Sequence, residues 1–244
     1  MPVTPGQHTV PTSDGPMPAL LWHPDPAVPR PGLVVLQEIF GLSDYVVARC
    51  AALADLGYAV LAPEIYWRLG GDVVRDDDPG FLDRAMGLVQ QLDWDAAVRD
   101  GVAAVEHFDN TPGVTEVGLV GFCFGGGLAF NVAAELEGTS SEPSGLVSYY
   151  GSALPQLIDI APDVTCPSLH HFGSADAYVP LDQVERIRAA VTDGGARDDV
   201  ELHLYDGAGH AFDNPHPMFH HAPASEEAWD RTERWLLRHL PVPT

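Results

Sequence analysis

Lysine is absent from this 244-residue chain, and positive charge of any kind is scarce. All 12 basic residues are arginines, against 35 aspartates and glutamates, which gives a formal net charge of -23. A surface with so few cations offers little to nucleic-acid phosphates or anionic lipids, so we expect neither nucleic acid nor membrane as a partner. Two explanations of the acidity stay open: codon usage in a GC-rich genome, or adaptation to high salt, which screens self-repulsion. A melting temperature that does not rise between low and molar salt would exclude the second.

Cysteine is also rare, and long apolar runs are missing. Cys50, Cys123 and Cys166 are odd in number and form no C-x-x-C pair, so we expect neither a disulfide framework nor a structural zinc site. No apolar run approaches the roughly 18 residues that a membrane-spanning helix needs. The first ten residues lack the basic and apolar segments of a secretory signal. These absences predict a cytoplasmic protein.

The remaining sequence alternates short β-branched runs with amphipathic segments. Strands are expected at 32–38, 59–64, 116–122, 145–151, 166–173 and 200–207, and helices at 43–58, 93–108, 125–136, 180–195 and 225–240. The proline-rich N-terminus and residues 23–32 are expected to form turns and a connector. This alternation predicts one α/β domain over residues 1–244, with a mostly parallel central sheet covered by helices on both faces. Ligands of such folds bind at the carboxyl ends of the strands.

Three chemically distinctive residues each follow an expected strand. Cys123 lies in GFCFG, Asp176 in FGSADAYVP and His210 in YDGAGHAFD. A nucleophile between two glycines, followed along the chain by an acid and then a histidine, is typical of α/β-hydrolases. Each residue alone has an ordinary structural interpretation, as a buried thiol, a turn aspartate or a packed histidine. Together they favour a catalytic set in which His210 deprotonates Cys123 and Asp176 orients His210.

The backbone around Cys123 suits the same chemistry. The thiol would lie over the N-terminus of the helix at 125–136, whose partial positive charge favours thiolate. The amides of Phe124 and Ile39 are expected to form an oxyanion hole. A thiolate leaves a tetrahedral adduct more readily than an alkoxide or an amide nitrogen does. A cysteine nucleophile therefore indicates activated esters and enol lactones rather than peptides or simple alkyl esters.

Several motifs resemble the dienelactone hydrolase family in residues and in spacing. They are QEIFG at 37–41, APEIY at 62–66, GFCFGG at 121–126, GSADAYVP at 173–180 and GAGHAF at 207–212. The resemblance implies an α/β-hydrolase fold, a Cys-His-Asp triad, hydrolysis of lactones or esters, and no metal or other cofactor. It also implies that Glu38 contacts the resting thiol and gates its reactivity.

The sequence departs from well-known family members where they hold a substrate carboxylate. In those enzymes serine follows the catalytic histidine and arginine comes three residues later, whereas here the two positions are Ala211 and Asn214. A further arginine of the family has its nearest counterpart in Arg84. The other candidates for the substrate pocket are Tyr66 and Arg68. We therefore expect small anionic lactones to bind poorly and neutral esters to be preferred.

Two hypotheses of function follow. The first is a cysteine-dependent hydrolase of a lactone or activated carboxylic ester that acts through a thioester acyl-enzyme on a small-molecule substrate. The alternative is a non-catalytic α/β-hydrolase scaffold that binds a small ligand, although such a scaffold would not need Cys123, Asp176 and His210 together. The sequence predicts neither the particular ester nor the oligomeric state.

Overall fold

The central feature of the fold is one eight-stranded sheet, with strand order β1-β2-β4-β3-β5-β6-β7-β8. The computed structural model describes residues 4–23, 25–71, 73–75 and 77–243. The strands are β1 Gly6–Thr12, β2 Gly15–Trp22, β3 Arg30–Leu36, β4 Ala59–Pro63, β5 Val114–Phe122, β6 Leu146–Tyr149, β7 Ser168–Gly173 and β8 Val200–Tyr205. Strands β3 to β8 pair in parallel, and β1 and β2 join them antiparallel. The predicted mostly parallel sheet is confirmed.

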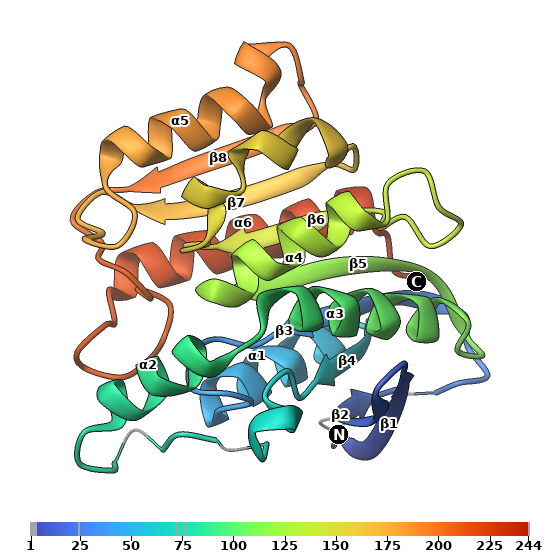
Figure 1. Cartoon of the computed structure of the whole chain (residues 1–244). Coiled ribbons are helices and arrows are strands. Elements are labelled where there is room, and N and C mark those ends of the chain that lie inside the picture. Colours follow the sequence, from blue (N-terminus) through green and yellow to red (C-terminus); the bar gives the residue numbers. More distant parts are fainter. Residues whose placement is uncertain (1–3, 24, 72, 76, 244) are drawn as a thin grey trace.

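Helices cover both faces of the sheet (Figure 1). The α-helices are α1 Asp44–Asp55, α2 Phe81–Gln91, α3 Trp94–Asp109, α4 Phe124–Glu135, α5 Leu181–Val191 and α6 Ala222–His239. Short 3-10 turns lie at Trp67–Leu69, Leu154–Gln156, Ile158–Asp163 and Asp193–Gly195. Helices α3, α4 and α5 contribute to the hydrophobic core on one face, and α1 and α6 to the core on the other. The predicted α/β arrangement is confirmed, and α2 adds a helix that the periodicity did not predict.

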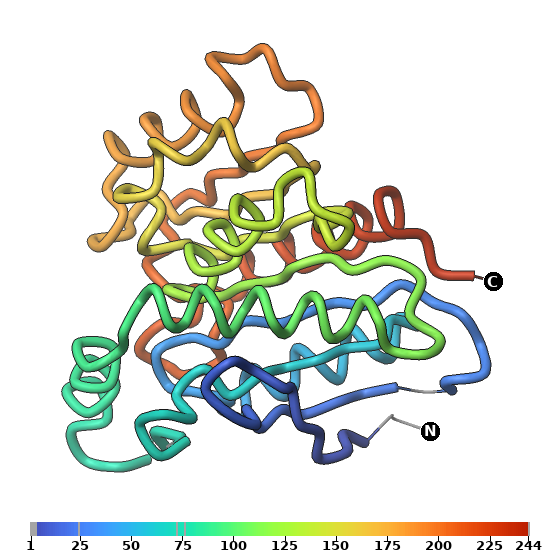
Figure 2. The backbone as a smooth tube through the Cα atoms, turned by 45° about the vertical axis from the view of Figure 1, so that its right-hand side comes forward, coloured from blue at the N-terminus to red at the C-terminus, as the bar shows by residue number. Residues whose placement is uncertain are grey.

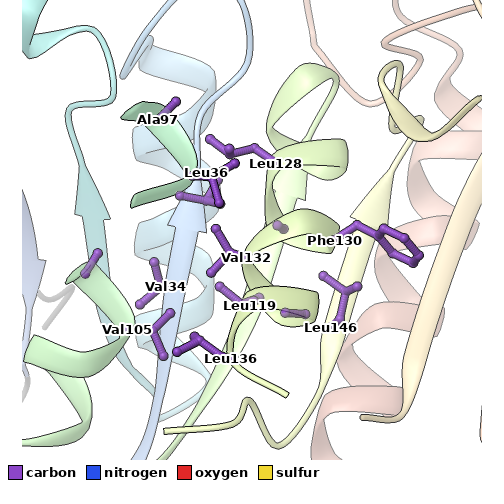
Figure 3. Close-up of a cluster of buried hydrophobic side chains, with 14 of the residues drawn as sticks. Val34, Leu36, Ala97, Val105, Leu119, Leu128, Phe130, Val132, Leu136 and Leu146 are labelled. Atoms are coloured by element: carbon purple, nitrogen blue, oxygen red, sulfur yellow. The ribbon is translucent and has the colours of Figure 1, made fainter. Parts of the chain in front are cut away.

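Strand β3 shows why the central strands are apolar throughout. Val34 and Leu36 point into the core below α3 and α4, while Leu33 and Val35 point into the core below α1 and α6. Figure 3 shows the first of these cores, where Leu36 lies close to Leu128 of α4 and Val34 lies further along the strand, near Val132 of α4. A strand covered on both faces has no polar side, so its sequence reads as a continuous hydrophobic run.

An antiparallel hairpin of β1 and β2 occupies the N-terminal region, where turns and a connector were expected. That expectation is wrong for residues 6–22, because the prolines fall where the sheet tolerates them. Pro11 lies in the edge strand, and Pro16 and Pro18 precede Ala19, where the pairing of β2 with β4 begins. The hairpin and β8 lie at opposite ends of the sheet in both views (Figures 1 and 2). Pro24, within the expected connector, lies outside the described residues.

The carboxyl ends of the parallel strands meet on one side of the molecule. Strand β5 ends at Phe122, β7 at Gly173 and β8 at Tyr205. The loops that follow them lie on the left of Figure 1, together with α2 and the loop between β8 and α6. Within the described ranges, no helix has the length and apolar character required to cross a membrane.

Candidate active site

Cys123 occupies a strained turn between β5 and α4. Its backbone has φ 56° and ψ -124°, a conformation that L-residues rarely adopt. The flanking glycines make this turn possible. A Cβ at Gly121 would lie 2.1 Å from the carbonyl oxygen of Gly125, and a Cβ at Gly125 would lie 2.3 Å from that of Gln37. The chain can therefore turn sharply only with glycine at both positions, and the thiol is held at the N-terminus of α4.

The structure brings together the three residues that the sequence singled out. The Sγ atom of Cys123 lies 3.1 Å from Nε2 of His210. On the other side of the ring, Nδ1 of His210 donates to Oδ2 of Asp176 at 2.8 Å. The second oxygen of Asp176 accepts hydrogen bonds from the amides of Tyr178 (2.8 Å) and Val179 (3.1 Å). The buried carboxylate is thus fixed by its own loop and fixes the orientation of the imidazole.

This geometry favours the protonated form of His210. Burial opposes the imidazolium, but the negative charge of Cys123 and the hydrogen bond to Asp176 outweigh burial and raise the pKa of His210 to about 10. At neutral pH His210 can therefore act as a proton donor, with the Cys123 sulfur on one side of its ring and the Asp176 carboxyl on the other.

Two tyrosine rings enclose the imidazole. The buried ring of Tyr150 meets His210 edge-on at a centroid distance of 5.3 Å, and its hydroxyl lies 3.0 Å from that of Tyr45. On the solvent side the ring of Tyr178 lies 4.9 Å from His210, although 65% of this residue is exposed. Neither contact could be predicted from the sequence, because each depends on how separate loops pack.

The two amides expected to form the oxyanion hole belong to segments held by one tyrosine. Phe124 is the first residue of α4, so its amide has no acceptor within the helix. Ile39 lies in the turn closed by a hydrogen bond from the Gly41 amide to the Glu38 carbonyl. The hydroxyl of Tyr66 donates to the Ile39 carbonyl at 3.2 Å, and its ring stacks on Phe124 at 5.8 Å. Tyr66, one of the expected pocket residues, therefore braces both segments.

Glu38 is buried, and its hydrogen bonds differ from the expected contact with the thiol. Oε1 accepts from the Ser43 hydroxyl at 3.1 Å, and the side-chain amide of Asn214 donates to Oε1 at 3.0 Å and Oε2 at 3.3 Å. Burial raises the pKa of Glu38 to about 7, although these hydrogen bonds and His210 oppose the rise. The hydrogen-bond partners of the Cys123 sulfur within the described residues are His210 and, at 3.8 Å, Ser152.

The two arginines expected near the substrate are paired with carboxylates elsewhere. Arg68 binds the buried Asp100 and, at 2.6 Å, the exposed Asp14. Arg84 pairs with Asp78 at 2.6 Å on the surface of α2. Both guanidinium groups therefore have carboxylate partners within the protein.

The segment after His210 is anchored by a buried ion pair that the sequence did not predict. Ala211 has φ 56°, and two residues later the buried carboxylate of Asp213 binds the guanidinium of Arg49 and the hydroxyls of Tyr45 (2.6 Å) and Ser225 (2.7 Å). The next residue is Asn214, so this network fixes the side chain that holds Glu38. Asp213 gave no sequence signal, because an aspartate in a loop is ordinarily solvated.

The model of the family described as "Dienelactone hydrolase family" matches residues 17–240. The carboxymethylenebutenolidase of Pseudomonas putida is 36% identical over 75% of this chain and 75% of its own length. An Escherichia coli K12 protein, provisionally named a carboxymethylenebutenolidase, is 30% identical over 96% of this chain and 87% of its own.

Solved structures agree with the sequence relatives. A crystal structure from Klebsiella pneumoniae, provisionally named a dienelactone hydrolase, superposes with a TM-score of 0.80 at 25% identity and covers 97% of this chain and 99% of its own. The superposition extends over the sheet and both helix layers, so the expected α/β-hydrolase fold is confirmed.

Proposed function

Because this chain belongs to the dienelactone hydrolase family and is a hydrolase of esters or lactones, we propose that it acts through Cys123 and a thioester acyl-enzyme. The observation that carries the proposal is the continuous line of hydrogen bonds from the Cys123 sulfur through His210 to Asp176. The strained turn supports it as well, since strain of this kind is typical of functional positions.

In the first half of the reaction the Cys123 thiolate attacks the carbonyl carbon of the substrate, and the carbonyl oxygen becomes an oxyanion. The amides of Phe124 and Ile39 stabilise that charge. The oxyanion then collapses, the carbon–oxygen bond to the leaving group breaks, and the His210 imidazolium gives its proton to the departing oxygen. The product is a thioester on Cys123 and a free alcohol or enol, which in a lactone stays attached to the acyl group.

In the second half a water molecule attacks the thioester. His210, now neutral, takes a proton from this water, and Asp176 stabilises the imidazolium that forms. The carbon–sulfur bond breaks, the carboxylic acid leaves, and the thiolate–imidazolium pair is restored. Substrates with a stabilised leaving group suit this reaction, because the first tetrahedral adduct must expel the leaving-group oxygen rather than the Cys123 sulfur.

The charge around the site favours a neutral substrate. Asn214 stands where well-known family members have an arginine, and it is bound to the Glu38 carboxylate. Arg68 and Arg84 have carboxylate partners of their own. A neutral ester should therefore exceed its carboxylate-bearing analogue in kcat/KM, and the reverse preference would show that another cation binds the substrate.

The experiment that tests the proposal is the hydrolysis of p-nitrophenyl acetate by the Cys123→Ala protein. Its turnover should fall at least about a thousandfold, because a missing nucleophile removes most of the catalysis. Cys166→Ala is the matched control, since Cys166 is also buried but lies in the loop just before β7 and outside the triad. Unchanged turnover in Cys123→Ala removes Cys123 as the nucleophile. If the wild type hydrolyses no ester or lactone in a broad panel but binds a small ligand tightly, the non-catalytic scaffold is favoured.

A further inference from the structure

A cavity of about 310 Å³ lies beside the candidate active site and is used by no step above. Its wall includes Glu38 and Phe40, the two neighbours of Ile39, whose amide is an expected oxyanion donor. Asn214, the hydrogen-bond partner of Glu38, also lines it. The volume is within the usual range of small-molecule sites and about twice that of an engineered cavity that binds benzene. The cavity therefore borders the turn that carries one of the two expected oxyanion donors.

Aromatic rings form one wall of this cavity. Phe40 lies in the turn before α1, Phe81 begins α2, and His216 and Phe219 belong to the loop before α6. The centroid of Phe81 lies 5.5 Å from that of Phe40 and 5.2 Å from that of His216, and His216 lies 5.4 Å from Phe219. These are the separations at which aromatic rings attract one another. An aromatic ring of a ligand could pack against the edges and faces of these side chains in the same way.

The wall also exposes apolar surface to water. Val73 lines the cavity with 44% of its surface exposed, beside the buried Val74. Covering such a side chain with a ligand removes apolar area from water, which favours binding of an apolar group.

The charged groups at the cavity exclude anions. Glu38 and Asp44 both line it. Among the described residues there, Arg75 is the only arginine, and its guanidinium already pairs with Asp77 at 3.1 Å in an exposed position. An anionic ligand would therefore meet the Asp44 carboxylate, the Glu38 carboxyl, which is also negative above about pH 7, and one cation that is already paired.

We infer that this cavity is a subsite for a neutral aromatic ring of the substrate, so that the enzyme prefers neutral esters or lactones that carry an aryl group. The inference rests on the proposed function, because it identifies the part of the substrate that lies next to the carbonyl attacked by Cys123.

The turnover test compares 2,2,2-trifluoroethyl phenylacetate with 2,2,2-trifluoroethyl acetate in a pH-stat. The leaving group is the same and has no ring, so only the acyl part differs. The wild type should show a kcat/KM ratio of about ten or more in favour of the phenylacetate, as burial of a ring implies. Phe81→Ala should lower the ratio to below about three, and so should Val73→Trp, which fills the cavity from its exposed side. Met86→Ala, an exposed position of the same helix that does not line the cavity, should keep the wild-type ratio.

A binding test separates failure of the subsite from failure of the proposed function. Phenylacetamide, whose amide nitrogen leaves poorly, is titrated into the Cys123→Ala protein and followed by NMR, with and without Phe81→Ala. Where the wild type hydrolyses both esters, a ratio near one, unaffected by Phe81→Ala and Val73→Trp, overturns the subsite and leaves the nucleophile untouched. If neither ester is hydrolysed, the proposed function fails. The subsite still stands in that case if phenylacetamide binds and Phe81→Ala abolishes the binding. Absence of binding in that case overturns both.

Discussion

Glu38→Gln should stabilise the protein, and the gain should depend on pH. The Glu38 carboxyl is buried, and burial raises its pKa to about 7 from an ordinary value of 4.5. Glutamine has the same shape without the charge. Its carbonyl oxygen can take the position of Oε1, where Ser43 and Asn214 donate, and its amide then replaces Oε2, which accepts only the longer 3.3 Å contact.

The sign and the size of the effect follow from proton linkage. Between pH 4.5 and pH 7 folded Glu38 retains a proton that the unfolded chain releases, so the wild type loses stability as pH rises through this window. Each tenfold difference in proton affinity corresponds to about 1.4 kcal/mol, so the loss approaches roughly 3 kcal/mol above pH 7. The glutamine variant does not have this loss. At pH 4.5 the variant should be slightly less stable than the wild type. The difference in free energy of unfolding, variant minus wild type, should then rise by about 3 kcal/mol between pH 4.5 and pH 8.

Urea unfolding followed by circular dichroism measures this difference at several pH values. Other titrating groups are common to both proteins and cancel in the comparison. Glu137→Gln is the matched control, because Glu137 is exposed and should show a constant difference near zero. A flat difference between Glu38→Gln and wild type across this range would refute the reasoning that burial holds Glu38 protonated.

Three further predictions concern the surroundings of the site. Tyr178→Ala should lower kcat by roughly threefold to tenfold and alter its pH profile, while Tyr178→Phe stays near wild type, because an aromatic pair contributes about 0.5–1.5 kcal/mol. Arg49→Met should lower the urea-unfolding free energy by about 3–5 kcal/mol by leaving Asp213 buried without its cation, and adding Asp213→Asn should recover most of the loss. In a protein lacking the other two cysteines, Glu38→Ala should speed iodoacetamide alkylation of Cys123 above about pH 7, because it removes a negative charge that disfavours thiolate without touching any hydrogen bond of the sulfur; superimposable pH profiles would contradict gating by Glu38.

The candidate triad could be located from the sequence because each of its three residues has a signal in the residues directly around it. Each residue follows a strongly apolar strand, and parallel strands place their carboxyl ends at one edge of a sheet. Gly121 and Gly125 identified the turn at Cys123, and the structure gives each glycine a steric reason. The central strands could be predicted equally well, since a strand covered on both faces has a continuous apolar sequence.

Other parts of the site depend on which loops meet in space. The contact between Arg49 and Asp213 joins residues 164 positions apart, and neither has a sequence pattern that names its partner. The rings of Phe81, in α2, and His216, in the loop before α6, likewise meet only through the packing of distant segments. The N-terminal hairpin was missed because proline normally argues against a strand, and only the pairing registers of β2 show that its prolines precede the contact with β4.

The most direct test of Cys123 as the nucleophile is the mass of the enzyme during turnover. Wild-type protein is mixed with p-nitrophenyl acetate, quenched in acid within the first turnovers, and examined by intact-protein and peptide mass spectrometry. We predict one added acetyl group, located on the peptide that contains Cys123 and removed by hydroxylamine, as a thioester is. An acetyl group on another residue such as Ser152, whose hydroxyl lies 3.8 Å from the sulfur, together with continued turnover in Cys123→Ala, would contradict the cysteine mechanism.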